Sequence, residues 1–416
     1  KSELCHSRWL FSINHTRIDP LINIGMDIFY NKGQYFSHTD YFKLQEKTDN
    51  GQHYIYPIEI DMSISCPPYN DKELVERANN FTYDIPDDIL NDVKKGLCKI
   101  LFDFTHECYD VTYKYNGHRD FTHIMITNTQ QKYSLDKSEL VLACGNAKPY
   151  KDVEYNVVTV QNQLFTPIYQ GDVFLHNKEY NILNVTENKY KLLTFMGKPY
   201  YHRARLANFI YQNNLKQYNI VSCLTPFDDI AISNWKDQLH LSEEFLNTLP
   251  WEYDATTQDV HQDIKCTLTS EPEKQAHMDS YISFVSETFF SYTSNDNNDY
   301  ELDMTAKSTK PIVTMQPFIL HAQIGALKYI KSFGFETFDK WWDESYDAIT
   351  THDDRYNHLT DIYKKLSLTP HRELALMIKD MHPILRHNLD LYNDIRDNGK
   401  YLKELHDTLE IMFHKG

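Results

Sequence analysis

Glycine is scarce in this chain, with 12 in 416 residues, and no glycine-rich motif that cradles phosphate is present. The lack of GxxxxGK[ST] excludes a phosphate-binding loop of the NTPase kind, and the lack of GxGxxG argues against a dinucleotide oxidoreductase. No HExxH motif or tight set of cysteine and histidine indicates zinc, and no GxSxG elbow indicates a serine hydrolase. A clear Asp-x-Asp at a strand end is missing too, so we expect no metal site. The charge of a phosphate ligand must then be neutralised by lysine, arginine and helix dipoles.

Closely spaced cysteines and long apolar runs are missing as well. The seven cysteines form no CxxC pair, and an odd, dispersed set is typical of reduced thiols in a cytosolic protein. No apolar run approaches the roughly 18 residues of a membrane span, and no secretory signal opens the chain. We therefore expect a soluble, cytoplasmic protein without a membrane span.

Positive charge is in deficit. Lysine and arginine together number 42 against 59 aspartates and glutamates, so the formal net charge is −17 with histidine neutral. Affinity for polyanions comes from counterions released at lysine and arginine contacts, so such a chain cannot coat nucleic acid non-specifically. A segregated basic groove stays open as an alternative, and its candidates are Lys94, Lys95, Lys99, Lys114 and Arg119.

The first half of the chain predicts alternating strands and helices. The length of 416 residues and the 41% hydrophobic content indicate two globular domains. The segment 85–96 has Pro86 near its start, acids in its first turn and Gly96 as a stop, which predicts a helix. The predicted strands of this half are 54–60, 97–104, 122–127 and 139–144. This β-α-β rhythm favours a parallel sheet.

A second rhythm of the same kind begins near residue 170. Its predicted elements are strands at 191–196, 218–223, 281–286 and 317–321 and helices at 205–214 and 307–315. The chain then ends in helices, one starting at Thr369-Pro370 and one carrying an apolar packing stripe of Leu402, Leu405, Leu409 and Met412.

The predicted fold class is α/β, with two Rossmann-like domains facing a cleft and C-terminal helices. We place the domains at residues 1–170 and 171–365, followed by a helical segment at 366–416. No linker rich in proline or glycine marks the boundary between the two domains.

A basic segment, GKPYYHRAR at 197–205, lies between a predicted strand and a predicted helix. We expect its Lys198, His202, Arg203 and Arg205 to converge on one point and to hold a diphosphate, with arginine giving bidentate contacts and lysine a point charge. The alternative is a basic loop that only solvates the start of the helix.

An acid and two lysines form a second candidate site. Glu287 follows the strand 281–286, and Thr305, Lys307 and Lys310 lie at the start of the next helix. In open α/β sheets, ligands bind beyond the carboxyl ends of the strands, and helix N-termini there attract phosphate. A carboxylate at a strand end can accept hydrogen bonds from a sugar diol. The alternative is an acid that caps the helix or forms an ion pair.

Three titratable residues lie at the end of the predicted strand 97–104, in the segment DFTHE at 103–107. Asp103, His106 and Glu107 are the best candidates in the first half for a general base. Asp61, after strand 54–60, is a weaker competitor, and a polar loop without a catalytic role is the alternative for each residue.

Together these segments resemble the C-terminal donor domain of GT-B glycosyltransferases, especially of the α1,3-fucosyltransferase type. The run TAKSTKPIVTMQPFIL with GFETFDKWWDESYD resembles fucosyltransferase-like proteins that are frequent in bacteriophages and large viruses. GKPYYHRAR is similar to the basic loop that follows the first strand of their donor domain. The likeness covers residues 185–365, and the N-terminal half shares only the β-α-β rhythm of an acceptor domain.

The resemblance implies inverting, metal-independent transfer of a hexosyl, pentosyl or fucosyl group from a UDP- or GDP-linked sugar, without a further cofactor. It assigns Arg203 and Lys307 to the diphosphate, Glu287 to donor hydroxyls and Lys310 to the start of the phosphate-facing helix. A base from the N-terminal domain, with Glu107 favoured, would deprotonate the acceptor. The acceptor is either a glycan or protein hydroxyl or a hydroxymethylated base in viral DNA, which would be modified in the host cytoplasm after flipping into the cleft.

One position departs from the family pattern. Where these enzymes have Thr-Glu-Lys, this chain has Thr305, Ala306 and Lys307 in succession, and alanine cannot hydrogen-bond the donor ribose. Three explanations stay open: a neighbour such as Glu301 substitutes, the ribose contact is lost, or the alanine is a deliberate substitution. Ala306 also favours the alternative function, a non-catalytic protein with a GT-B fold that binds nucleotide-sugars or glycans.

Overall fold

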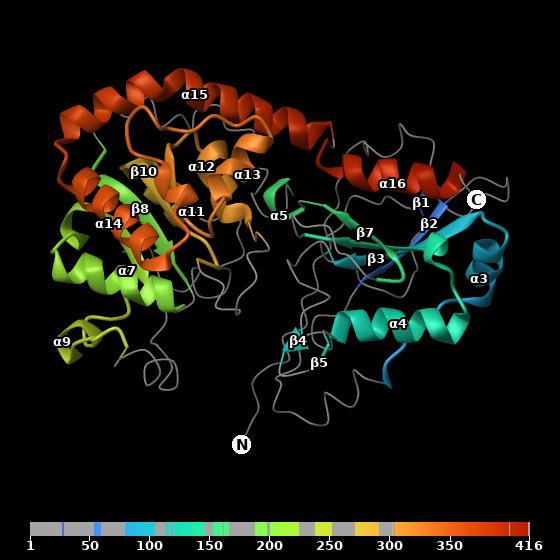
Figure 1. Ribbon diagram of the computed structural model, residues 1–416. Helices are drawn as coiled ribbons and strands as arrows, with labels where there is room; N and C mark the ends of the chain where they lie inside the picture. The colour runs from blue at the N-terminus through green and yellow to red at the C-terminus, as the bar shows by residue number, and fades with distance from the viewer. Residues whose placement is uncertain are drawn as a thin grey trace. The chain divides into compact units, whose positions relative to one another are not determined.

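The chain forms two compact units of parallel β-sheet and helices (Figure 1). The first unit comprises Lys1–Gly145, Pro149–Val160 and Leu402–Gly416, and the second comprises Asn146–Lys148 and Gln161–Tyr401. The computed structural model describes residues 27–28, 54–59, 80–104, 114–115, 118–119, 121–145, 153–160, 162–165, 188–197, 200–223, 238–251, 271–290, 302, 304–398 and 400–414.

The first unit is built on a five-stranded parallel sheet. Its strands are β1 (Asp27–Ile28), β2 (Tyr54–Glu59), β3 (Cys98–Phe104), β6 (Leu140–Cys144) and β7 (Asn156–Thr159). They lie side by side in chain order, and each pairs in parallel with its neighbour. The predicted strands 54–60, 97–104 and 139–144 are thereby confirmed, and so is the parallel sheet. A short antiparallel pair, β4 (Lys114–Tyr115) and β5 (His118–Arg119), stands apart from it.

Helix α3 (Asp87–Lys94) connects β2 to β3 and confirms the predicted helix at 85–96. Pro86 stands directly before its first turn, where a missing N–H costs nothing. Gly96 ends it with φ of +74°, a left-handed conformation that glycine adopts without a Cβ clash. The apolar face of α3, with Ile89 and Val93, packs on one face of the sheet.

The prediction of a strand at 122–127 is wrong, because these residues belong to helix α4 (Phe121–Tyr133). The run THIMIT is rich in β-branched residues, which favours a strand locally. Its buried side chains His123, Met125, Ile126 and Thr129 nevertheless lie on one face of a helix, and Met125 and Ile126 join the core beneath the sheet. Packing against the sheet therefore decides the conformation over the local preference.

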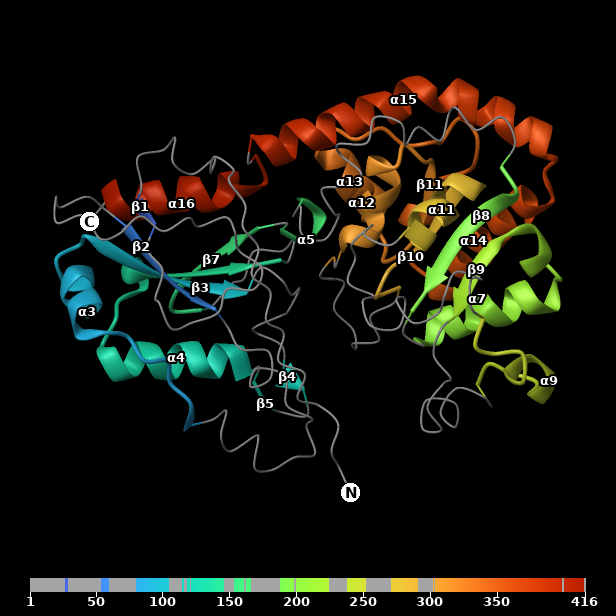
Figure 2. The same ribbon diagram turned by 180° about the vertical axis from the view of Figure 1, so that it is seen from behind.

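The C-terminal helix α16 (Lys403–His414) belongs to the first unit. It lies above the sheet in Figures 1 and 2, whereas α3 and α4 lie below it. The stripe of the predicted packing helix is buried at Leu405, Leu409 and Met412. By contrast, α15 (His371–Asp397), which begins just after Thr369-Pro370 as predicted, belongs to the second unit.

The basic groove considered for DNA is contradicted at Lys99, which is buried in β3. Its ammonium lies 5.5 Å from the ring centroid of Phe413 on α16, and burial lowers the pKa of Lys99. A lysine beneath a helix cannot contact a phosphate backbone. Lys94 and Lys95 are exposed, and the side chains of Lys114 and Arg119 lie outside the described part of the chain.

The second unit contains a four-stranded parallel sheet in the order β11-β10-β8-β9. The strands are β8 (Tyr190–Met196), β9 (Ile220–Cys223), β10 (Ser280–Ser286) and β11 (Phe318–His321), which confirms the four predicted strands of this half. The chain leaves β8 for β9 on one side and returns to β10 on the other. The direction of winding thus reverses between β8 and β10, where open α/β sheets bind their ligands.

Helices cover both faces of this sheet. They are α7 (Tyr201–Gln212), α11 (Glu271–Asp279), α12 (Ala306–Val313), α13 (Ala326–Ser332), α14 (His352–Leu368) and α15, with the short α5 (Asn162–Phe165) and α9 (Glu243–Leu246) beside them. Alternate residues of β10 face opposite sides, so Phe284 meets Tyr363 of α14, whereas Ser283 bonds Gln316 beyond α12. Among the helices of the described ranges, none has both the length and the apolar composition to cross a membrane.

Candidate functional site

The candidate site lies where β10 ends and α12 begins, beside the reversal of the sheet. Thr305 is the N-cap of α12, and its Oγ1 accepts a hydrogen bond from the Lys307 backbone N–H at 3.3 Å. The helix starts at Ala306, which confirms the predicted helix at 307–315 to within one residue of its start. The partial positive charge of its first turn therefore lies near the carboxyl end of β10.

The carboxylate of Glu287 is hydrogen-bonded by nearby residues of the protein. The carboxylate is fully buried and accepts hydrogen bonds from Thr305 Oγ1 at 2.8 Å, Thr305 N at 3.2 Å and Ser308 Oγ at 2.6 Å. Thr288 N at 3.3 Å and Lys307 Nζ at 3.4 Å complete the set. In this arrangement the carboxylate joins the end of β10 to the first turn of α12. The geometry supports the capping alternative for Glu287, because both carboxylate oxygens already have two or more donors.

Lys307 is the accessible cation of this cluster. Its side chain is 23% exposed, and its Nζ also donates to Thr288 Oγ1 at 3.0 Å and Thr305 Oγ1 at 3.1 Å. Neutral hydroxyls and one long contact to a carboxylate hold the ammonium weakly compared with a bidentate pair. An incoming phosphate could therefore recruit Lys307 by a small side-chain movement.

His202 and Arg203 lie in the first turn of α7, not in a loop. The predicted helix at 205–214 begins four residues earlier, at Tyr201, and this places both side chains in the interior. Arg203 Nη2 donates to the carbonyls of Ser286 at 2.8 Å and Glu287 at 2.9 Å, and His202 Nε2 donates to the Glu287 carbonyl at 3.0 Å. Both residues thus fasten α7 to the carboxyl end of β10.

The environment of His202 keeps its ring neutral. Desolvation, with smaller contributions from the Arg203 and Lys307 charges, lowers the pKa of His202 to about 3. The ring also stacks against Phe290 at 5.8 Å between centroids. A neutral, buried imidazole whose Nε2 is already bonded is a packing residue rather than a charge for a diphosphate.

Arg205 and Lys310 each face an acid of the protein. Arg205 pairs with Asp353 at 2.6 Å and lies over the Tyr356 ring at 3.8 Å. Lys310 pairs with Glu273 of α11, and both side chains are mostly buried, at 14% and 16% exposed. Both basic residues are therefore engaged by carboxylates in the protein without a ligand.

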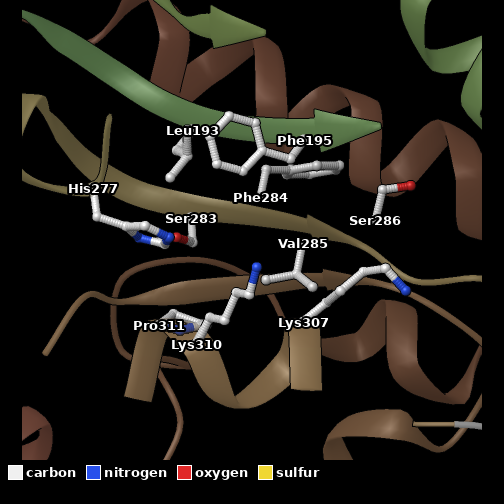
Figure 3. A pocket seen from close by; sticks show the side chains of 10 residues that line it. All are labelled: Leu193, Phe195, His277, Ser283, Phe284, Val285, Ser286, Lys307, Lys310 and Pro311. Carbon is white, nitrogen blue, oxygen red and sulfur yellow. The ribbon is translucent and has the colours of Figure 1, made fainter. Parts of the chain in front are cut away.

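A small cavity lies between α12 and the strands β8 and β10 (Figure 3). Its volume is about 50 Å³, enough for a few water molecules and far below the 300–1,000 Å³ or so of a typical small-molecule site. Lys307 and Lys310 rise from α12 beside β10, while Leu193 and Phe195 come from β8 and His277 from the end of α11. A cavity of this volume is too small for a whole nucleotide.

A buried polar chain at one end of this cavity was not predicted from the sequence. Gln316 Oε1 accepts from His277 Nδ1 at 2.7 Å and from Ser283 Oγ at 2.5 Å, and its Nε2 donates to the Ser280 carbonyl at 3.0 Å and to Ser280 Oγ at 2.9 Å. Desolvation lowers the pKa of His277 to about 3, so the ring is neutral. The visible sequence signal was only a glutamine before an apolar strand, which does not specify a partner.

A serine and a histidine also meet at the ends of β10 and β11. Ser286 Oγ lies 3.1 Å from His321 Nδ1, a distance typical of a nucleophile and its base. His321 is fully buried, and desolvation, together with the charges of His202, Arg203 and Arg355, lowers its pKa well below the usual value. Burial and these neighbouring positive charges disfavour the protonated ring that a general base must form, and we assign the pair a structural role.

The candidate bases of the first unit are mostly outside the described residues. Asp103 lies in β3 and is 2% exposed, with its backbone in register with Ala143 of β6. His106, Glu107 and Asp61 lie outside the described residues, as do Lys198 and Glu301 of the donor half. Burial keeps Asp103 out of reach of an acceptor hydroxyl in this structure.

In the described part of the chain, no group of three or more histidine, cysteine, aspartate or glutamate side chains is placed to hold a metal ion. Comparison with known proteins provides no assignment, since no family profile, characterised protein or solved structure matches the chain significantly.

Proposed function

We propose that the chain is a glycosyltransferase that takes a sugar from a nucleotide-sugar and places it on an acceptor hydroxyl. The observation that carries the proposal is the position of Lys307 and the first turn of α12 at the reversal between β8 and β10. A helix N-terminus and a half-buried ammonium at that point form a site for a diphosphate. The likeness of this segment to GT-B donor domains supports the same reading, and the GT-B arrangement of the two units is part of the proposal.

The residues around Lys307 have different roles in this proposal from those that the family pattern assigns. Lys307 binds the diphosphate and stabilises its charge as the sugar leaves. Glu287, with Thr305, fixes the orientation of α12, and Arg203 with His202 fixes α7 against the same strand end. These interior contacts fix α12, and with it the backbone of Lys307, before the donor arrives, which is the kind of preorganisation that lowers a transition-state barrier.

The general base comes from the first unit in this mechanism, where Glu107 or His106 deprotonates the acceptor. The burial of Asp103 favours Glu107 and His106 over Asp103 as the base. Transfer is inverting and uses no divalent metal, so lysine and the α12 dipole replace the metal at the leaving group. A glycan or protein hydroxyl is the favoured acceptor, since the burial of Lys99 weakens the groove that hydroxymethylated DNA requires.

Thermal unfolding with a panel of UDP-, GDP- and CMP-sugars tests the proposal. One class of nucleotide should raise the melting temperature, because a ligand at 100 times its Kd stabilises the folded state by about 2.7 kcal/mol. Lys307→Met should abolish this shift, and Lys379→Met, at an exposed position on α15, should preserve it. If no nucleotide-sugar stabilises the protein, even after Ala306→Glu restores the family glutamate, the donor site is wrongly assigned.

A non-catalytic nucleotide-sugar or glycan-binding protein is the second candidate. Ala306 and the saturated carboxylate of Glu287 favour it, because both remove an acid that could contact the donor. Glu107→Gln distinguishes the two candidates in an assay of transfer to a panel of glycan acceptors. An enzyme loses transfer and keeps nucleotide binding, whereas a binding protein shows no transfer before the substitution either.

A further inference from the structure

The cavity between α12 and the strands β8 and β10 has the features of an incomplete anion site. Lys310 lines it, and its ammonium is paired with the carboxylate of Glu273 from α11. The pair links two helices that flank the same cavity, and each side chain keeps about one-seventh of its surface exposed. A carboxylate and a phosphate oxygen make the same kind of charge-assisted hydrogen bond to an ammonium.

A second observation shows that the cavity is prepared for a polar ligand. His277 lines it, is 4% exposed, and donates from Nδ1 to Gln316 Oε1 at 2.7 Å. Its Nε2 is buried and has no hydrogen-bond partner among the described residues. Because the ring is neutral, with a pKa of about 3, this nitrogen is an acceptor that awaits an O–H or N–H donor. A buried acceptor without a donor is unfavourable and commonly marks a place for a ligand or water.

We propose that this cavity binds a phosphate at Lys310 and a neighbouring ligand hydroxyl at His277 Nε2, and that Glu273 occupies the phosphate position in the unliganded protein. The inference rests on the proposed function, because nucleotide-sugars and their diphosphate products present hydroxyls and phosphates together. In the liganded state Lys310 leaves Glu273, the link between α11 and α12 is released, and the cavity can widen. The Glu273 carboxylate thus competes with the ligand for Lys310. Only a ligand whose phosphate binds Lys310 more tightly than Glu273 does can occupy the cavity.

The competition has a measurable size. If Glu273 leaves the ammonium of Lys310 available to a ligand about one-sixth of the time, removing this competitor raises phosphate affinity about sixfold. Affinity that increases on loss of a protein side chain is not expected for a merely structural ion pair.

Calorimetric titration of the whole chain tests this inference, with inorganic pyrophosphate, UDP and GDP as probes. Glu273→Gln should bind pyrophosphate and one nucleoside diphosphate about sixfold more tightly than the unmodified chain. Lys310→Gln should weaken both, and the double variant should lose the gain. Asp361→Asn, exposed on α14, removes the same charge elsewhere in the unit and should leave affinity unchanged. If Glu273→Gln fails to fold, Glu273→Asp, which shortens the side chain and keeps its charge, should give a smaller gain.

The outcomes separate this inference from the proposed function. If the unmodified chain and both Glu273 variants bind the nucleotide equally well, Glu273 does not compete with the phosphate. The glycosyltransferase proposal is unaffected by that result. A gain seen with pyrophosphate alone supports the competitor and contradicts a nucleotide-sugar donor. A gain that survives in the double variant shows that Lys310 does not bind the phosphate, and an absence of binding to every variant refutes both proposals.

Discussion

Replacing Glu287 by glutamine distinguishes two roles of this residue: a cap of α12, or a residue that binds the donor sugar. The substitution keeps the shape of the side chain but replaces one carboxylate oxygen by an NH₂ group and removes the charge. Two of the five donors, Thr305 N–H and Ser308 Oγ, meet one oxygen, so an amide in that place turns at least one hydrogen bond into a repulsion. If Glu287 served only to bind a sugar, it would have no such bonds within the protein to lose. Its replacement by glutamine would then leave the stability unchanged.

The magnitude follows from the burial of this cluster. Hydrogen bonds to a charged group contribute about 1.5–3 kcal/mol each, and breaking one side of a buried charged pair costs about 3–5 kcal/mol. Because Lys307 retains partial exposure and can rehydrate, we expect the lower end, about 3 kcal/mol, for Glu287→Gln. Glu287→Ala, which also leaves a cavity, should cost about 4–5 kcal/mol.

Urea unfolding without ligand, followed by circular dichroism, measures this loss as a lower midpoint. Glu336→Gln, at an exposed position of the same unit, is the matched control and should change the free energy of unfolding by less than about 0.5 kcal/mol. A Glu287→Gln variant as stable as the control would refute the capping role and return Glu287 to the list of donor contacts.

Three further predictions concern stability. His202, His277 and His321 stay neutral when folded and take up protons at their usual pKa of 6.5 when unfolded, so stability is intact above that pH and declines below it. We expect a loss of about 2 kcal/mol per histidine between pH 7 and pH 5, and unfolding free energies that do not change over this range would contradict the assignment. Removing residues 402–416 should expose the face of the first sheet beneath α16, and dye binding and proteolysis should show that unit unfolding first; a unit that stays protected would disprove its dependence on α16. Gln316→Leu should lower the free energy of unfolding by about 3 kcal/mol, because it leaves several buried donors and acceptors unpaired. A calorimetric melting temperature equal to that of the unmodified protein would contradict a stabilising role of the buried hydrogen bonds around Gln316.

The sequence predicted the strands better than the roles of the polar residues. The buried runs before Glu287 and after Lys310 are strands because continuous apolar segments between helices suit a parallel sheet covered on both sides. The run at 122–127 has the same composition, yet it is a helix, because its contacts with the sheet, which lie far away in sequence, outweigh local preference.

The side-chain roles failed to follow from sequence for a related reason. Glu287, Arg203 and His202 were grouped correctly in space, since all three meet at the end of β10. Their burial was not visible, because it depends on α7 starting four residues before the predicted point and turning the basic segment inwards. Likewise, the carboxylate of the ion pair between Lys310 and Glu273 comes from α11, and no spacing rule links Glu273 to a helix that begins 33 residues later.

The position of a bound nucleoside diphosphate tests the central claim most directly. A structure of the chain with the stabilising nucleotide should place the diphosphate at the carboxyl ends of β8 and β10, within hydrogen-bonding distance of Lys307 Nζ and the first turn of α12. Glu287 should keep its contacts with Thr305 and Ser308 in that complex. A diphosphate bound elsewhere on the chain, with Lys307 still directed to Thr288 and Thr305, would contradict the account.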